Sequence, residues 1–182
     1  TPTTYQLSTA ATSAGTNAIQ YQYTNINTAG VTGSASDLIR LAASGNVATG
    51  NTALLTRSAA GILINSATPV TVNAAGFATL TVSNGGLLVA GGTSGSPVTH
   101  SIGSNLVVLG GNTYDLNLAV DANTTLDVQG VLRSSFNVTK TLPGTLQLSA
   151  KQYFNTGGNW FTVAAGKVIL NAGNNTLYPG RN

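Results

Sequence analysis

Short β-branched segments recur along almost the whole chain, and this regularity restricts the fold more than any other feature. Segments of about four to nine residues, rich in Val, Leu, Ile and Thr, are bounded by Gly, Asn, Ser or Pro. Many of them recur at intervals of roughly ten residues. The expected strands are residues 18–26, 37–41, 53–56, 61–65, 69–73, 77–83, 86–90, 105–109, 114–120, 124–128, 135–139, 144–148, 159–163, 167–170 and 175–178.

Several of these segments alternate apolar and polar residues with a period of two. Leu116, Leu118 and Val120 would share one face of a strand. Asn117 would lie on the opposite face, so the strand is expected to be buried on one side only. Helix signals are weak, because the abundant Gly, Thr, Val and Asn are poor helix formers. Residues 36–44 have the pattern of one or two helical turns, but we favour a strand there.

Evenly spaced short strands are compatible with a sandwich, a barrel or a solenoid. The number of strands is high for one sandwich of 182 residues. Asn84-Gly85 lies in a longer turn rather than in a two-residue hairpin. One phrase, a short strand followed by an Asn or Ala-Gly turn, recurs at residues 70–76 and 161–166. Recurrence of one unit favours a β-solenoid, with coils of roughly 20–30 residues stacked about 4.8 Å apart. We expect about seven coils.

The composition excludes several other classes of protein. Charged residues are only 6% of the chain and hydrophobic residues 42%, whereas disordered chains combine low hydrophobicity with high charge. The seven Lys and Arg are scattered singly, unlike the clustered patch of a nucleic-acid-binding protein. There is no Cys, so neither disulfides nor thiolate metal sites can form. No apolar run is long enough to span a membrane as a helix.

The titratable residues are few. His100 is the single histidine, and no Gly-x-Ser-x-Gly elbow accompanies it. We interpret it as a structural histidine with a local hydrogen bond. The carboxylates are Asp37, Asp115, Asp121 and Asp127, the last three at intervals of six residues. Paired carboxylates cleave sugar bonds in some enzymes and bind Ca²⁺ in others. Because no calcium-loop motif is present, we interpret them as solvated residues at strand ends. We assign no catalytic, cofactor-binding or metal-binding residue.

Two further groups of side chains follow from a solenoid. Aromatic residues gather near the C-terminus, and others lie near the start; they are Tyr5, Tyr21, Tyr23, Tyr153, Phe154, Trp160 and Phe161. They either bind sugar rings on the surface or stack along the rod, and we favour stacking, with Phe161 inward. Turn asparagines are expected to stack between coils; the candidates are Asn73, Asn84, Asn105, Asn112, Asn171 and Asn174.

The C-terminal part of the chain carries a longer phrase. Its segments are Val138-Thr139-Lys140-Thr141, Gly144-Thr145-Leu146-Gln147-Leu148-Ser149, Tyr153, Asn155-Thr156-Gly157-Gly158, Phe161-Thr162-Val163, Gly166 and Val168-Ile169-Leu170. This phrase, over residues 138–175, resembles the autotransporter-associated β-strand repeat, also called the passenger-associated transport repeat. The departures from that repeat are Leu142-Pro143, Lys151-Gln152 and Trp160. The resemblance implies a right-handed parallel β-helix that is exported and displayed outside the cell.

The whole chain, 1–182, is expected to form one β-solenoid domain. Residues 1–52 would form irregular or N-terminal rungs, residues 53–137 variable rungs, and residues 138–182 the autotransporter-associated repeat. The start Thr1-Pro2-Thr3-Thr4 is typical of a chain that follows a cleaved signal peptide.

Two hypotheses for function follow. The first is a secreted or cell-surface structural or adhesive protein, not an enzyme and without a cofactor. Its expected partners are copies of itself end to end, adjoining solenoid segments or surface glycans, with no nucleic acid and no insertion into the membrane. Neither end has a charged or helical cap, so the chain is expected to be part of a longer solenoid or a filament subunit. The second hypothesis is a carbohydrate-binding or carbohydrate-active β-helix domain.

Overall fold

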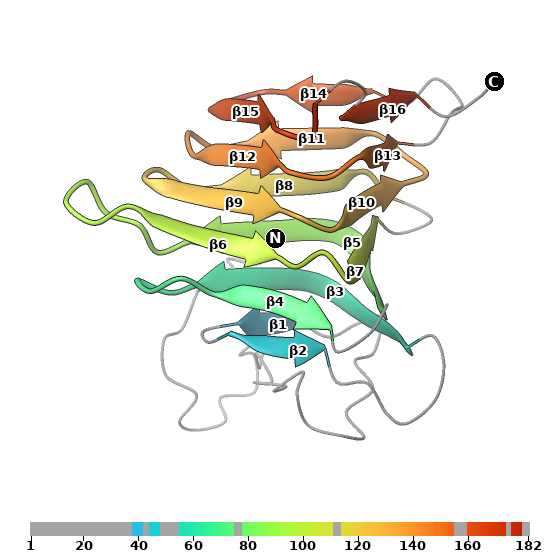
Figure 1. Ribbon diagram of the computed structural model, residues 1–182, viewed down its shortest axis with the longest axis horizontal. Helices are drawn as coiled ribbons and strands as arrows, with labels where there is room; N and C mark the ends of the chain where they lie inside the picture. Colours follow the sequence, from blue (N-terminus) through green and yellow to red (C-terminus); the bar gives the residue numbers. More distant parts are fainter. Residues whose placement is uncertain are drawn as a thin grey trace, which may run out of the picture.

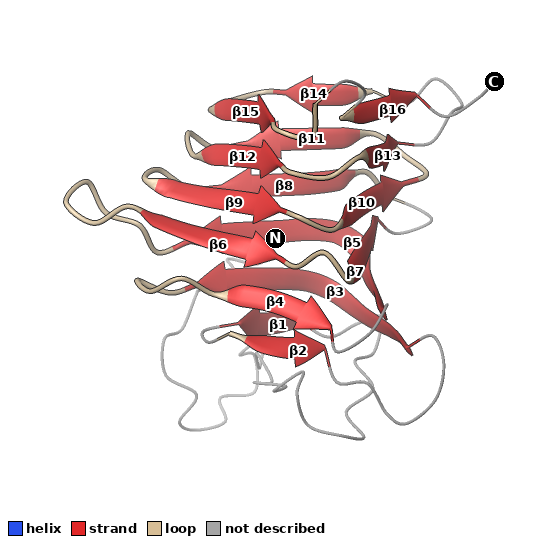
Figure 2. Cartoon of the chain, in the orientation of Figure 1, coloured by secondary structure: helices blue, strands red, loops and turns tan. Residues whose placement is uncertain are grey.

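A computed structural model describes residues 38–41, 44–47, 55–74, 78–110, 114–154, 160–173 and 176–179. This part of the chain is all-β and contains no helix (Figure 2). Its strands lie in two sheets, and every ladder between named strands is parallel. Strands that follow one another in sequence do not pair; each pairs with a strand one coil away, so the chain winds as a β-solenoid (Figure 1).

The coils have three faces. The first face contains the second halves of β3 (Leu55–Asn65) and β5 (Ala78–Ala90) together with β1 (Leu38–Leu41), β8 (Leu116–Val120), β11 (Val138–Thr141) and β14 (Phe161–Val163). The second face contains β2 (Gly45–Val47), β4 (Thr71–Ala74), β6 (Val98–Ile102), β9 (Thr124–Val128), β12 (Thr145–Leu148) and β15 (Lys167–Leu170). The third face contains the first halves of β3 and β5 together with β7 (Leu106–Gly110), β10 (Val131–Ser134), β13 (Gln152–Phe154) and β16 (Leu177–Pro179).

The most completely described part, residues 86–179, makes about four turns, each passing over the first, second and third faces in order. Strands β1 to β4 continue the same sheets on the N-terminal side. The expected number of seven coils and the expected right-handed winding are not confirmed and stay predictions.

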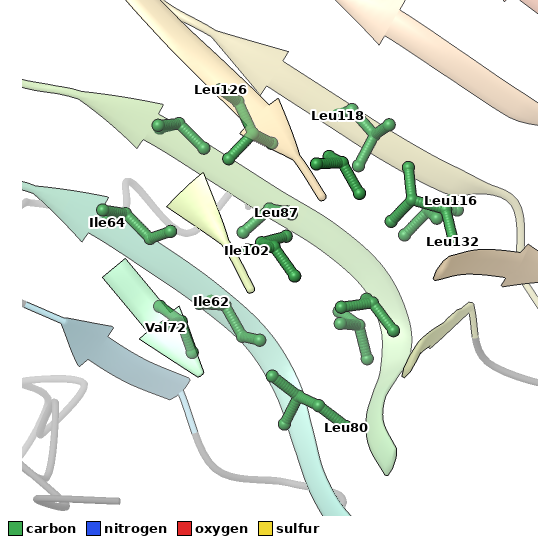
Figure 3. Close-up of a cluster of buried hydrophobic side chains, with 14 of the residues drawn as sticks. Ile62, Ile64, Val72, Leu80, Leu87, Ile102, Leu116, Leu118, Leu126 and Leu132 are labelled. Carbon is green, nitrogen blue, oxygen red and sulfur yellow. The ribbon is translucent and has the colours of Figure 1, made fainter. Parts of the chain in front are cut away.

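Residues in register pile up into columns along the axis. On the first face, Leu87 pairs with Leu118, Leu118 with Lys140, and Lys140 with Val163. On the second face, Leu126 pairs with Leu146, 20 residues later. The inward residues of these strands form one continuous core (Figure 3). The sequence period of two therefore becomes stacked apolar ladders, because alternate residues of every strand point inward.

Several expected strands are confirmed, and others need correction. Residues 124–128 and 167–170 have the expected bounds, and residues 38–41 are a strand rather than a helix. The segments 53–56 and 61–65, expected as two strands, correspond to one strand, β3, which bends between two faces. The segments 77–83 and 86–90 likewise correspond to one bent strand, β5. Gly85 is at a bend, with a φ of 73° that few other residues adopt.

Four strands were missed by the sequence analysis: β2, β6, β10 and β13. Each has a polar or small residue at an inward position or has only three residues, which hides the alternation. In β6 the buried residue is His100, and in β13 it is Gln152. Strand β11 begins three residues later than expected. The expected strand at residues 18–26 lies outside the described residues.

The turn between β11 and β12 carries one of the predicted departures from the autotransporter-associated repeat. Leu142 has a φ of 63°, in the left-handed region, where an L-residue other than Gly costs about 1–2 kcal/mol. The following Gly144 is held by close packing, because a Cβ there would lie 2.1 Å from the carbonyl oxygen of Asp121 in the coil beneath. The chain turns sharply enough to keep the coils at strand spacing, and Leu142 bears the strain.

Loss of one rung of the apolar column is predicted to destabilise the protein. Leu118 is fully buried, whereas the adjacent Asn117 is exposed on the outer side of the same strand. Leu118→Ala should lower the free energy of unfolding by about 2–5 kcal/mol, because it removes transfer energy and leaves a cavity. The matched control Asn117→Ala should change it by less than about 0.5 kcal/mol. Chemical denaturation measures both, and equal effects would contradict the inward assignment.

Relief of the strain at Leu142 is predicted to stabilise the protein. Leu142→Gly should raise the free energy of unfolding by about 1 kcal/mol, since Gly adopts a positive φ without a steric cost. Leu142→Ala is the matched control: it shortens the side chain but keeps the strain. If the Ala variant gains as much as the Gly variant, the backbone explanation is wrong.

Candidate functional site

Among the described residues, three large polar side chains occupy inward positions in mainly apolar columns. They are His100, Lys140 and Gln152, and each is fully buried. His100 pairs with Leu126, Lys140 with Leu118, and Gln152 lies in register with Leu177. A buried polar group without partners costs free energy, so the contacts of each one determine its role.

His100 uses both ring nitrogens. Its Nδ1 accepts a hydrogen bond of 3.1 Å from the backbone N–H of Val70, one coil below. Its Nε2 lies 3.0 Å from the carbonyl oxygen of Ala90, to which it donates in the neutral tautomer that leaves Nδ1 as an acceptor. Burial lowers the pKa of His100, and the hydrogen bond to Ala90 offsets part of that effect. The ring ties two coils together, in keeping with the structural interpretation, and it borders no carboxylate among its described hydrogen bonds.

Lys140 donates to three carbonyl oxygens at the corner between the first and second faces. Its Nζ lies 2.8 Å from Thr141 O and 2.7 Å from Leu142 O. A third bond of 3.1 Å reaches Ala165 O in the next coil. Burial lowers the pKa of Lys140, but the three acceptors match the three donors of an ammonium group. The side chain closes a corner that would otherwise leave carbonyl groups without partners.

Gln152 plays the same part on the third face. Its Oε1 accepts a hydrogen bond of 2.6 Å from the N–H of Leu132, and its Nε2 donates to the carbonyls of Gly130 and Ala150. Because a shift of one residue would place each of these side chains outside, they fix the register of their strands. Sequence reasoning treated Lys140 and Gln152 only as features of a repeat motif.

The aspartates do not converge on one site. Asp115 precedes β8, Asp121 follows it, and Asp127 lies within β9. Asp121 is exposed and accepts a hydrogen bond of 2.7 Å from the N–H of Ala122. The expectation of solvated strand-end residues therefore describes Asp121 and Asp115 but is wrong for Asp127, which is buried in mid-strand. Asp37 lies outside the described residues.

Asp127 is the centre of a polar network on the outer side of the second face. Its Oδ1 accepts hydrogen bonds from Ser149 Oγ at 2.6 Å and from Gln147 Nε2 at 3.2 Å, both in the next coil. Its Oδ2 accepts a bond of 2.9 Å from Gln129 Nε2. The carboxylate is thus occupied by neutral donors that link two coils, and this geometry does not leave it aimed at a substrate.

A second ladder lies at the corner that leads into the first face. Asp115 Oδ1 accepts from both the backbone N–H and the side-chain amide of Asn137, at 3.1 and 3.2 Å. One coil further, Asn137 Oδ1 accepts a bond of 2.9 Å from the N–H of Trp160. These residues recur at intervals of 22 and 23, and that period was the signal that could have identified Asn137.

Of the six asparagines expected to stack, Asn171 makes a contact with the coil beneath, a bond of 3.5 Å to Ser149 Oγ. Asn84 is exposed, Asn105 is half-buried, and the buried Oδ1 of Asn73 has no hydrogen-bond partner among the described residues. Asn112 and Asn174 lie outside the described residues. Stacking between coils is real, but other side chains carry most of it, because the register depends on loop lengths that one sequence does not fix.

The aromatic residues are divided between core and surface. Phe161 is half-buried against the core, as expected. Tyr114, Tyr153 and Trp160 are exposed by 55%, 45% and 73%. Tyr5, Tyr21, Tyr23 and the side chain of Phe154 lie outside the described residues. Tyr114 and Trp160 therefore keep more than half of their surface exposed.

Neither a metal cluster nor a membrane helix is found within the described ranges. No three His, Cys, Asp or Glu side chains of this part of the chain lie close enough to hold a metal ion, and no helix there could cross a membrane. Comparison with protein-family models, curated proteins and solved structures finds no match.

The burial of His100 predicts a pH-dependent stability. Its pKa in the folded protein is lowered from the ordinary value of 6.5, so between those two values the unfolded chain binds more protons. The free energy of unfolding should therefore fall as the pH falls from 7 towards 5. Denaturation at several pH values measures it, in a range above the titration of ordinary aspartates near 3.9.

The control for this prediction is His100→Gln. Glutamine does not titrate, yet it offers one acceptor and a donor group to Val70 and Ala90. Its stability should vary less between pH 7 and pH 5 than that of the parent protein. Parallel losses in both proteins would show that another group is responsible.

Proposed function

We propose that this chain is an extracellular, non-catalytic β-solenoid that serves as a structural or adhesive part of a cell surface. The observation that carries the proposal is the use made of the scarce polar groups. Four of these groups form hydrogen bonds with the backbone or with neighbouring coils: His100, Lys140, Gln152 and Asp127. Groups that in an enzyme would face a substrate here hold coils in register.

The outer surface supports a mechanical role. Only 6% of the residues are charged, and outward strand positions carry neutral polar side chains such as Asn117, Thr139 and Thr145. Backbone hydrogen bonds run along the axis from coil to coil, and local opening must break bonds to both neighbours. A rod built in this way resists proteolysis, since cleavage needs an opened backbone.

The resemblance to the autotransporter-associated repeat supports export and display as a passenger. Its segments coincide with structural units: residues 138–141 are β11, residues 145–148 are β12, and residues 161–163 and 167–170 are β14 and β15. Membership of that family and the right-handed winding are part of the proposal. Right-handed connections between parallel strands are strongly favoured in proteins.

Carbohydrate binding is the second candidate, and a specific observation favours it. Tyr114 and Trp160 are both exposed beside the corner that leads into the first face, and rings at the surface can stack on sugars. Asp115 and Asn137 lie at the same corner and offer polar groups of the kind that bind hydroxyls. Adhesion to surface glycans would use this corner without any chemical step.

The proposal is tested with the purified chain by a polysaccharide-cleavage screen, a glycan array and limited proteolysis. We expect no cleavage of any polysaccharide and a protease-resistant body that includes residues 114–154. Cleavage that disappears in Asp121→Ala and Asp127→Ala would overturn the non-catalytic assignment. Glycan binding that is lost in Trp160→Ala but kept in Leu142→Ala, a matched exposed apolar residue, would establish the second candidate instead.

A further inference from the structure

The last described coil has an open side. Strand β14 has β11 as its one described neighbour, β15 has β12, and β16 has β13. Val163 and Leu170 lie at inward register positions in this coil, yet they are exposed by 47% and 52%. In the coil beneath, the residues in the same columns are Lys140 and Leu148, and both are fully buried. The difference arises because nothing described covers the last coil.

The uncovered residues belong to the columns that hold the coils together elsewhere. Val163 continues the column of Leu87, Leu118 and Lys140. Leu170 continues the column of Ile102, Val128 and Leu148. Phe161, Val168 and Leu177 are half-buried beside them. The surface is therefore one half of the same coil-to-coil contact that the chain repeats along its axis, and its complement is another coil of parallel strands.

The other end of the described solenoid has the matching strands. The first face ends in β1, the second face in β2 and the third face in the first half of β3. Strand β1 belongs to the same sheet and face as β14, β2 to that of β15, and the first half of β3 to that of β16. Each strand of the C-terminal coil would run parallel to its partner in the second copy, because all the ladders within the solenoid that connect the two ends are parallel. Strands β1, β2 and the first half of β3 of one copy can therefore extend β14, β15 and β16 of another copy, each on its own face.

We propose that the open C-terminal coil, β14 to β16, is a docking edge for the β1–β3 coil of a second copy of this chain. The contact is heterologous, because two different surfaces meet, and it does not close. It therefore generates an axial filament in which each junction imitates an internal coil contact. The inference rests on the structural role proposed above and specifies the partner and the strands that meet.

Paired substitutions in β14 test the apolar part of the contact. Val163 lies on the inward side of the strand, and Thr162 is exposed on the outward side. Sedimentation and negative-stain microscopy should show particles of the parent chain that lengthen with concentration. Val163→Asp should reduce assembly at least tenfold at equal concentration, because docking would bury its carboxylate. Thr162→Asp should assemble like the parent. A parent chain that stays monomeric, or an unchanged Val163→Asp variant, would overturn the proposal.

A cysteine pair tests the register independently. The chain has no Cys. Leu38 and Thr162 occupy the same register column, through Gly61, Gly86, Asn117 and Thr139. Docking would bring their Cα atoms about 4.8 Å apart, within the range of a disulfide. The double variant Leu38→Cys, Thr162→Cys should give a ladder of covalent oligomers on oxidation. The control pair Ser101→Cys, Thr162→Cys should not, because Ser101 lies in the middle of the second face.

The outcomes separate this inference from the proposed function. If Thr162→Cys alone forms covalent dimers and the double variant forms no oligomer larger than a dimer, two C-terminal ends meet. That result would overturn the head-to-tail contact. A monomeric rod that resists protease and cleaves no polysaccharide would refute the docking edge but leave the structural role intact. Specific polysaccharide cleavage would refute the structural role whatever the state of assembly.

Discussion

Stacking of one coil on the next is the interaction on which every other feature of this protein depends. Inward aliphatic side chains form columns such as that of Leu87 and Leu118, while backbone hydrogen bonds join the same coils along the axis. The apolar contacts provide the driving force, and the hydrogen bonds set the spacing and direction. Each coil can bury its apolar side only against a neighbour, so no coil is a stable unit alone.

The buried polar side chains make sense within this arrangement. A column of aliphatic residues alone tolerates slippage, because one branched side chain packs on another in several registers. His100, Lys140 and Gln152 do not, since each must meet particular carbonyl or N–H groups. They replace part of the apolar contact with specific bonds, which makes the wrong register costly. The outer ladders through Asp127 and through Asp115 and Asn137 add the same kind of constraint at the surface.

The proposed function rests on the contacts that the buried polar side chains make with the backbone and with neighbouring coils. Lys140 and Asp127, two of the few charged residues, join neighbouring coils, and for this reason we propose a non-catalytic role. The described part presents to solution the outer side of its faces, the exposed rings of Tyr114 and Trp160, and the exposed Val163 and Leu170 of the last described coil. The faces and rings suit adhesion, and the open side suits elongation, since its exposed Val163 and Leu170 repeat a contact already used within the chain.

The sequence by itself determined the class of fold. Period-two alternation in strands such as residues 116–120 and 145–148 depends only on local geometry, and the recurring turns predicted a solenoid. It did not determine which coils meet, because the register depends on how many residues each turn contributes. The register partners Gly86 and Asn117 are 31 positions apart, whereas Asn117 and Thr139 are 22 apart, so the spacing between partners is not constant along the chain. Only the tertiary structure therefore revealed that Asn137 lies over Asp115, that Asp127 is buried, and that Lys140 closes a corner. Each of these side chains has a partner 20 or more positions away, which it meets only once the coils are stacked.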